Sequence, residues 1–177
     1  MFLELIAAIV AGVALAGIAM AMRWASRGLL PKWFVPMAAG IGILSYGVWS
    51  EYSWFSRATA GQPNGVVIAW HNAESAPWRP WSYLAPVVTR FTAVDTRTTQ
   101  RNPDFPDQRI VDVLFAGRWQ SSALVKVVFD CAGRRRADVV GGKVAIGDNG
   151  EITGARWIDL AGDDAVLNAA CGTPRRG

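Results

Sequence analysis

The sequence predicts an N-terminal transmembrane α-hairpin of two helices and a C-terminal mainly-β domain, antiparallel and sandwich- or barrel-like, with a short C-terminal helix. Two long uncharged runs near the N-terminus, later β-branched runs between turn residues, and two cysteines in the later part support this class. The predicted organisation is a hairpin over 1–57 with helices at about 2–22 and 33–55 and a loop at 23–32, a linker at 58–65, and a β-rich domain over 66–177.

The two uncharged runs, Leu5–Met22 and Trp33–Ser50, are each 18 residues long. A hydrocarbon layer of about 30 Å needs about 20 helical residues, so each run is long enough to span it. The alternative is a pair of buried core helices, but a domain this small does not enclose two of them. A signal peptide is disfavoured for the first run, because Glu4 stands where a basic residue is expected.

The charges between the runs predict the orientation. Arg23, Arg27 and Lys32 lie there without an acid, and basic residues of short loops stay in the cytoplasm. We therefore expect the N-terminus and the C-terminal domain on the periplasmic side of a bacterial cytoplasmic (inner) membrane. The net charge is +4, but the C-terminal part is nearly balanced, which argues against nucleic acid as a partner.

Aromatic residues flank the two runs. Trp and Tyr favour the headgroup level, because their rings are apolar at one end and hydrogen-bond at the other. The predicted membrane-interface anchors are Trp24 and Trp33 on the cytoplasmic side and Trp49, Tyr52 and Trp54 on the opposite side.

Small residues recur at a spacing of four along both runs. Ala8, Gly12 and Ala16 lie in the first run, and Ala38 and Gly42 lie in the second. Small side chains let helix backbones approach each other in lipid. Either the hairpin packs against itself through them, which we favour, or they dock another membrane subunit.

After the linker, the pattern is that of short strands. Apolar or alternating runs occupy 65–70, 87–95, 109–119 and 122–131, a strand edge or hairpin return occupies 133–140, and a hairpin turns at 148–150. The segment 95–109 reads as a long polar loop, and 163–171 reads as a helix with acids at its start.

Both cysteines, Cys131 and Cys171, fall in the part that we expect outside. An even pair in an oxidising compartment predicts a disulfide, which would stabilise the domain by about 4 kcal/mol in the chain-entropy model. The alternative is two buried free thiols.

Two resemblances point to the same architecture. "VVFDCAGRRRADVV", followed by "DDAVLNAACG", resembles the end of surface-adhesin-E-like domains, which are exported β-rich modules with one Cys after a strand and another near the C-terminus. "VWSEYSWF" and "APWRPWSYLAP" resemble two-helix inner-membrane proteins of bacteria with an exported domain. The resemblances imply an exported β-rich fold without a known activity, and they carry over no functional residue.

No catalytic signature is visible. His71 is the single histidine, and the sequence has no GxSxG, Gly-rich phosphate loop or HExxH motif. A zinc site needs three or four ligands, and both cysteines are better used as a disulfide. We therefore expect no enzyme, no catalytic residue, no metal and no cofactor.

Arg134, Arg135 and Arg136 form the densest charge of the chain. On a strand, Arg134 and Arg136 share one face, where guanidinium groups could hold an anionic headgroup or an acidic partner surface. The alternative, which we favour, is a solvated edge strand that uses charge to resist pairing.

A short stretch rich in Trp and Pro, Ser75–Pro86, precedes the second strand. Pro77 and Pro80 favour polyproline II geometry, in which Trp78 and Trp81 project from the same side. The strip could cover the domain's own core, lie on the membrane surface, or dock a partner subunit. The candidate partner or lipid contacts are Trp78, Arg79, Trp81, Tyr83, Arg134, Arg135 and Arg136.

The sequence favours a non-enzymatic, membrane-anchored accessory, assembly or stabilising subunit of an inner-membrane protein complex. The expected partners are the lipid bilayer and another integral membrane protein or complex. The alternative function is a membrane-anchored module that binds or senses an anionic lipid or envelope component.

Overall fold

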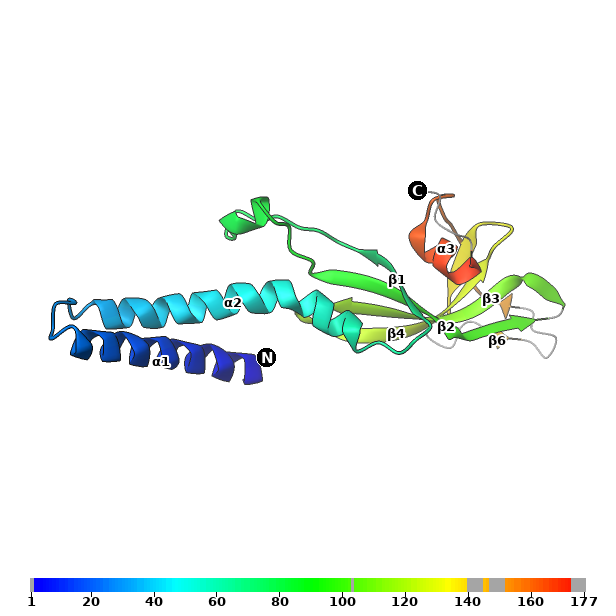
Figure 1. Ribbon diagram of the computed structural model, residues 1–177. Coiled ribbons are helices and arrows are strands. Elements are labelled where there is room, and N and C mark those ends of the chain that lie inside the picture. The colour runs from blue at the N-terminus through cyan, green and yellow to red at the C-terminus, as the bar shows by residue number, and fades with distance from the viewer. Residues whose placement is uncertain (1, 103, 140–144, 147–151, 173–177) are drawn as a thin grey trace. The chain divides into compact units, whose positions relative to one another are not determined.

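The computed structural model describes residues 2–102, 104–139, 145–146 and 152–172. The chain divides into two compact units, Met1–Arg57 and Ala58–Gly177, here named the helical unit and the sheet unit (Figure 1).

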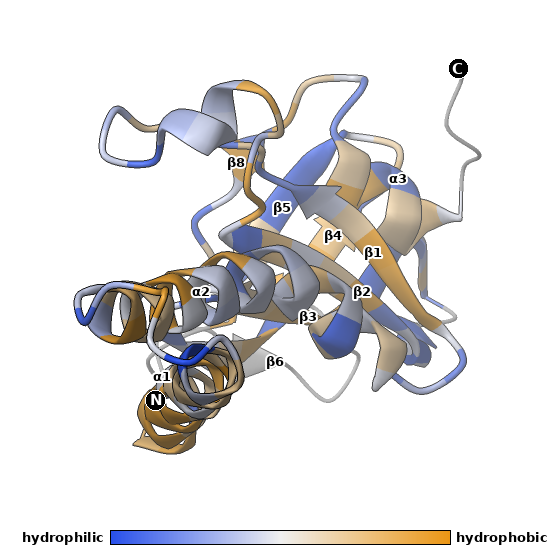
Figure 2. Ribbon diagram, turned by 60° about the vertical axis from the view of Figure 1, so that its left-hand side comes forward, coloured by the Kyte–Doolittle hydropathy of each residue, from blue (hydrophilic) through white to orange (hydrophobic). Residues whose placement is uncertain are grey.

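The helical unit is an antiparallel pair of helices, α1 (Phe2–Ala25) and α2 (Phe34–Ala60) (Figure 1). α2 continues to Ala60, so the segment predicted as a linker is helical in its first three residues. Among the described residues, α1 is the helix long and apolar enough to cross a membrane (Figure 2). Because α2 is less apolar, spanning by both helices stays a prediction.

The two helices pack closely at Gly12 and Gly42, which are both buried. A Cβ on Gly42 would lie 2.7 Å from the carbonyl oxygen of Ala11, and one on Gly12 would lie 2.8 Å from Cγ1 of Ile43. Only glycine permits this approach, as in other helix pairs that associate through small residues. The interpretation in which the hairpin packs against itself is confirmed at these positions.

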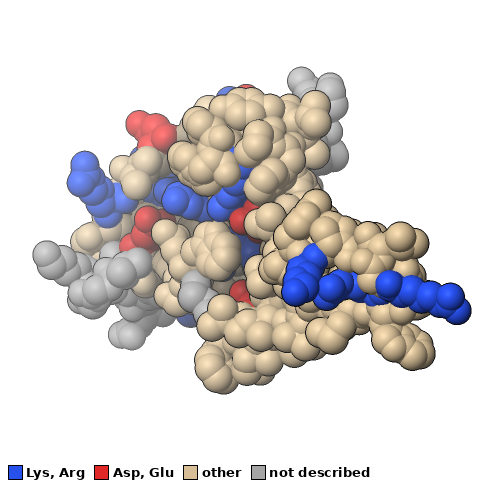
Figure 3. Space-filling model, turned by 90° about the vertical axis from the view of Figure 1, so that its left-hand side faces the viewer, with Lys and Arg blue, Asp and Glu red and all other residues tan. Residues whose placement is uncertain are grey.

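The turn of the hairpin carries the basic residues. Arg23 Nε donates a hydrogen bond to the Leu30 carbonyl oxygen at 3.1 Å, and Arg27 and Gly28 adopt positive φ angles of 53° and 85°. Figure 3 shows Lys and Arg side chains gathered at this end of the hairpin.

The sheet unit contains a six-stranded antiparallel sheet in the order β1-β2-β3-β4-β5-β8 and a separate antiparallel pair, β6-β7. The strands are β1 (Val66–His71), β2 (Arg90–Asn102), β3 (Phe105–Gly117), β4 (Gln120–Asp130), β5 (Arg135–Asp138), β6 (Ala145–Ile146), β7 (Ile152–Thr153) and β8 (Ile158–Asp159). The β6-β7 pair agrees with the predicted hairpin, whose turn at 148–150 lies outside the described residues.

The predicted antiparallel β domain and short C-terminal helix are confirmed. The sandwich- or barrel-like closure is not found: among the described strands the order is linear, with β1 and β8 at opposite ends and unpaired to each other. A helix covers one face instead. This helix, α3 (Ala165–Cys171), packs on β1, β2, β3 and β4 (Figure 1).

The main core lies between α3 and the sheet. Alternate positions of neighbouring strands supply Val94, Val113 and Val127, and α3 supplies Leu167 and Ala170. All five residues are buried. Since side chains alternate between the faces of a strand, this set marks the face under α3.

Both ends of α3 are held in place. Its N-cap Asp164 accepts hydrogen bonds from the backbone N–H groups of Val166 and Leu167, and its C-cap Gly172 is left-handed, with φ 67°. Capping provides hydrogen-bond partners for the N–H and C=O groups that are unpaired at the helix ends. These groups are a large share of the backbone in a helix of seven residues.

Candidate functional site

One end of the sheet extends beyond α3. A seven-residue helix is about 10 Å long, whereas a strand of the length of β4 runs for about 37 Å. The covered half of β4 is buried, and the half that begins at Gln120 is exposed. The end of the sheet that carries the β3–β4 turn therefore presents apolar side chains outside the core.

A row of four cross-strand neighbours forms the floor at this end. Trp70 pairs with Thr92, Thr92 with Phe115, and Phe115 with Ala123. Trp70 and Phe115 are exposed. The row lines a cleft of about 410 Å³, which Arg90 and Gln120 also border.

A second cleft, of about 210 Å³, lies between the β3–β4 turn and the loop that follows β1. Trp119 comes from the turn, and Trp78 comes from the loop. Both clefts are lined by Arg90, Gly117 and Gln120, so they adjoin. We call the two together the tip cleft.

The tip cleft combines aromatic rings with positive charge. Arg79, Arg90 and Arg118 line it, against Glu74 as the acid of the lining set. The Arg118 guanidinium carbon lies 5.0 Å from the centre of the Trp119 ring, a cation–π arrangement. Trp and Arg are the side chains that most often dominate the energy of protein interfaces.

The Ser75–Pro86 stretch, here named the tryptophan loop, forms one wall of the tip cleft. Its base is closed by Glu74 and Val87, which exchange two backbone hydrogen bonds of 3.0 Å each. Polyproline II geometry is wrong for its centre, since Pro80–Tyr83 is a 3-10 helix. Proline at the first position of this helix has the φ angle that the turn requires.

A buried serine holds the tryptophan loop together. Ser82, which is 0% exposed, donates through Oγ to the Arg79 carbonyl oxygen at 2.6 Å and accepts from the Ala76 N–H at 2.9 Å. Ser75 Oγ donates to the Ser82 carbonyl oxygen at 2.8 Å. These bonds fix the backbone without any help from the aromatic side chains.

The aromatic side chains of the tryptophan loop point away from the core. Trp78 is 75% exposed and Trp81 is 37% exposed, and Tyr83 and Leu84 are exposed as well. The alternative in which this strip covers the domain's own core is therefore wrong for Trp78. The core interior already contains Val and Phe side chains from the strands, so the loop is not needed to close it.

The arginine triplet divides between exposed and engaged positions. Arg134 is exposed with φ 50° in the turn before β5. Arg135 donates to Asp130 Oδ2 at 2.6 Å and stacks at 5.2 Å on the Trp157 ring, and Arg136 lies 3.9 Å from Asp138. The triplet therefore contributes to the fold. The edge-strand interpretation is wrong, because β5 pairs on both sides, with β4 and with β8.

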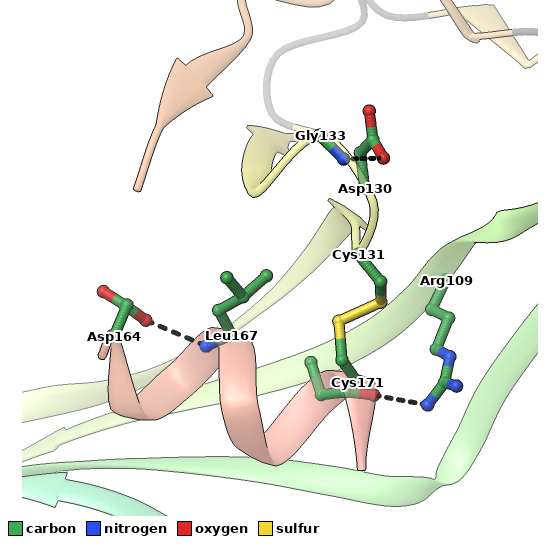
Figure 4. The surroundings of a disulfide bond; sticks show 8 residues. Arg109, Asp130, Cys131, Gly133, Asp164, Leu167 and Cys171 are labelled. Carbon is green, nitrogen blue, oxygen red and sulfur yellow. Dashed lines mark hydrogen bonds between the residues drawn. A yellow bond between two sulfur atoms is a disulfide. The ribbon is translucent and has the colours of Figure 1, made fainter. Parts of the chain in front are cut away.

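The predicted disulfide between Cys131 and Cys171 is confirmed (Figure 4). It joins the end of β4 to the last residue of α3, with the two Cα atoms 5.9 Å apart. Arg109 Nη1 of β3 donates to the Ala170 carbonyl oxygen at 3.2 Å, where the negative end of the helix dipole favours a cation. The disulfide and this contact both fix α3 on the sheet.

Asp130, next to the disulfide, is buried, and its carboxylate accepts hydrogen bonds from neighbouring groups. It accepts from the Gly133 N–H at 2.8 Å and from Arg135. Burial raises the pKa of this carboxyl, but the hydrogen bonds from Gly133 and Arg135 outweigh burial and hold the pKa below its usual value.

The predicted interface anchors lie along the helical unit. Trp24 is near the end of α1, Trp33 directly precedes α2, and both are exposed; Trp49, Tyr52 and Trp54 lie in the second half of α2. The Arg57 guanidinium carbon lies 5.1 Å from the centre of the Trp49 ring. Their placement along the helices is compatible with two aromatic belts.

Sequence reasoning missed much of the tip cleft, namely Trp70, Arg90, Phe115, Arg118 and Trp119. Trp119 could have been noticed, because a large apolar residue is unusual in a tight turn such as "GRWQ". The others read as ordinary strand residues, and their position outside the core depends on how far α3 reaches.

In the part of the chain that the structure describes, no group of three or more His, Cys, Asp or Glu side chains could hold a metal ion. No family model, curated protein or solved structure matches the chain.

Proposed function

We propose that the protein is a membrane-anchored, non-enzymatic accessory subunit that docks its exported sheet unit on another integral membrane protein through the tip cleft. The observation that carries the proposal is the tip cleft itself, in which exposed Trp and Phe side chains lie beside arginines. The apolar helix α1 and the disulfide support an anchored, exported chain.

The charges of the tip cleft define the expected partner surface. Three arginines face one glutamate, so the complementary segment is acidic and has apolar side chains for the aromatic floor. Loss of a central Trp from such an interface costs at least about 2 kcal/mol, or about 30-fold in Kd. Trp119→Ala is the variant that tests this loss.

Site-specific photocrosslinking in native membranes tests the proposal. A photoreactive residue at Ser121, which lines the tip cleft, is compared with one at Thr153, an exposed position of β7. We expect a single membrane-protein adduct from Ser121 and none from Thr153, with an acidic segment in the crosslinked peptide. Arg90→Glu and Trp119→Ala should both abolish the adduct and the co-purification of that protein in mild detergent.

An adduct that survives Arg90→Glu, or that forms equally from Thr153, would contradict docking through the tip cleft. Circular dichroism of each variant confirms that the chain is folded, so a lost adduct is not mistaken for a lost fold.

A further inference from the structure

The tryptophan loop exposes its largest apolar side chains to an unusual degree. Leu84 is 92% exposed, Trp78 is 75% exposed and Tyr83 is 63% exposed. The hydrogen bonds of Ser82 and the closed base at Glu74 and Val87 fix the backbone in the conformation that exposes these side chains. Exposed apolar clusters of this kind mark surfaces that contact a membrane or another protein.

The composition of the tryptophan loop matches the interfacial layer of a bilayer. The stretch contains two Trp, one Tyr, one Leu and Arg79, and it contains no Asp or Glu. Trp and Tyr favour the headgroup level, and Leu favours the acyl chains. The same residue types occupy the interface positions predicted for α2.

Chain length keeps the tryptophan loop near any membrane that the preceding helices cross. Five residues, 61–65, separate α2 from β1 and span at most about 18 Å. β1 then carries the chain about 20 Å to the start of the loop. A loop tethered this closely meets the bilayer at a high effective concentration, so even a weak interfacial contact is populated.

We infer that the tryptophan loop is a second membrane contact, which inserts Tyr83 and Leu84 into the interfacial layer of the bilayer. This inference rests on the membrane anchoring in the proposed function. It assigns Tyr83 and Leu84, which do not line the tip cleft, to lipid, and the tip cleft with Trp78 and Arg79 to protein. The sheet unit would then be attached to the membrane at two points, through the linker and through the loop.

The quenching of a site-specifically attached dye by spin-labelled lipid tests the inference in the full chain. The native disulfide leaves no free thiol, so an environment-sensitive dye is attached to Leu84→Cys, to Leu124→Cys or to Val10→Cys. Leu124 is an exposed leucine of β4 at 66% and serves as the matched control, and Val10 of α1 reports on anchoring. The proteins are reconstituted in vesicles of phosphatidylethanolamine and phosphatidylglycerol with or without a spin-labelled lipid.

We expect the dyes at Leu84 and Val10 to emit at shorter wavelength and to lose fluorescence to the spin-labelled lipid, while the dye at Leu124 keeps its fluorescence. Quenching at Val10 without quenching at Leu84 overturns the inference and leaves the anchor intact. A dye at Leu84 that is shielded only in native membranes would mean a protein contact, and the lipid assignment would be wrong. Absence of quenching at Val10 overturns the anchoring itself.

Discussion

At the scale of single residues, Asp130 couples the stability of the sheet unit to pH. Its pKa is lowered in the folded state, because hydrogen bonds from Gly133 and Arg135 outweigh the effect of burial. A lowered pKa means that the folded chain binds fewer protons than the unfolded chain. The stabilisation is therefore fully present well above the unfolded pKa of about 3.9 and is lost as the pH falls through the folded value.

We predict that Asp130→Asn lowers the melting temperature at pH 7 and that the difference from the wild type shrinks as the pH falls below about 4. Thermal unfolding of the full chain in detergent, followed by circular dichroism across pH, measures this difference. Asp163→Asn, which removes an exposed carboxylate just before α3, controls for the loss of one negative charge. A difference that stays constant from pH 7 to pH 3 would show that the Asp130 charge does not stabilise the fold.

At the scale of the elements, the contact between α1 and α2 depends on glycine. A Cβ at Gly42 would meet backbone atoms of Ala11 and Gly12 at 2.7 and 3.1 Å, whereas one at Gly47 would meet nothing within 4 Å. Backbone cannot move aside as a side-chain tip can, so the helices must separate to admit a methyl group.

We predict that Gly42→Ala destabilises the hairpin by about 1–3 kcal/mol, the usual cost of overpacking. Gly47→Ala adds the same methyl group to the same helix and should have a small effect. Loss of the helical circular-dichroism signal during titration of the detergent-solubilised protein with sodium dodecyl sulfate compares the two variants. Equal midpoints for both would refute the tight contact at Gly42.

The β2–β3 hairpin shows where the sequence pattern is a poor guide. The segment 95–109 is polar and contains prolines, so it reads as a loop, yet most of it extends β2 and β3. Its Thr residues favour strands, and polar side chains are tolerated because α3 covers only a part of the sheet. The valine-rich segments, by contrast, were predicted correctly, because burial produces the apolar pattern that identifies strands.

The tip cleft could not be predicted for a related reason. Trp70 is far along the chain from Phe115 and Trp119, and it comes beside Phe115 only through the register of β1, β2 and β3. The sequence does reveal the tryptophan loop, since its residues are consecutive. It does not reveal which way they point, because that depends on the hydrogen bonds of Ser82.

At the scale of the whole molecule, the charge of the hairpin turn predicts the topology. Arg23 lies in the last turn of α1, and Arg27 and Lys32 lie between the helices, with no acid among them, which favours a cytoplasmic turn. We predict that Ser122→Cys in β4 reacts with an impermeant maleimide in intact spheroplasts and that Ser26→Cys reacts only after permeabilisation. Labelling of Ser26→Cys in intact spheroplasts would show the opposite orientation, with the hairpin turn outside.

A mass measurement of the purified chain separates an anchor from a cleaved leader. The mass of the purified chain should include the α1 segment, Phe2–Ala25, if α1 stays in the membrane. A mature chain that begins after α1 would instead identify α1 as a signal sequence.

The position of the disulfide has a consequence for how the chain matures. Cys131 follows the four strands β1 to β4, and its partner comes 40 residues later. A chain that emerges N-terminus first therefore presents a lone reactive thiol until Cys171 arrives. With two cysteines in all, oxidation has one intramolecular product and needs no isomerase to correct shuffled pairs. Misoxidation within this protein alone can only link two chains, so a high local concentration of unfinished chains is a hazard to correct assembly.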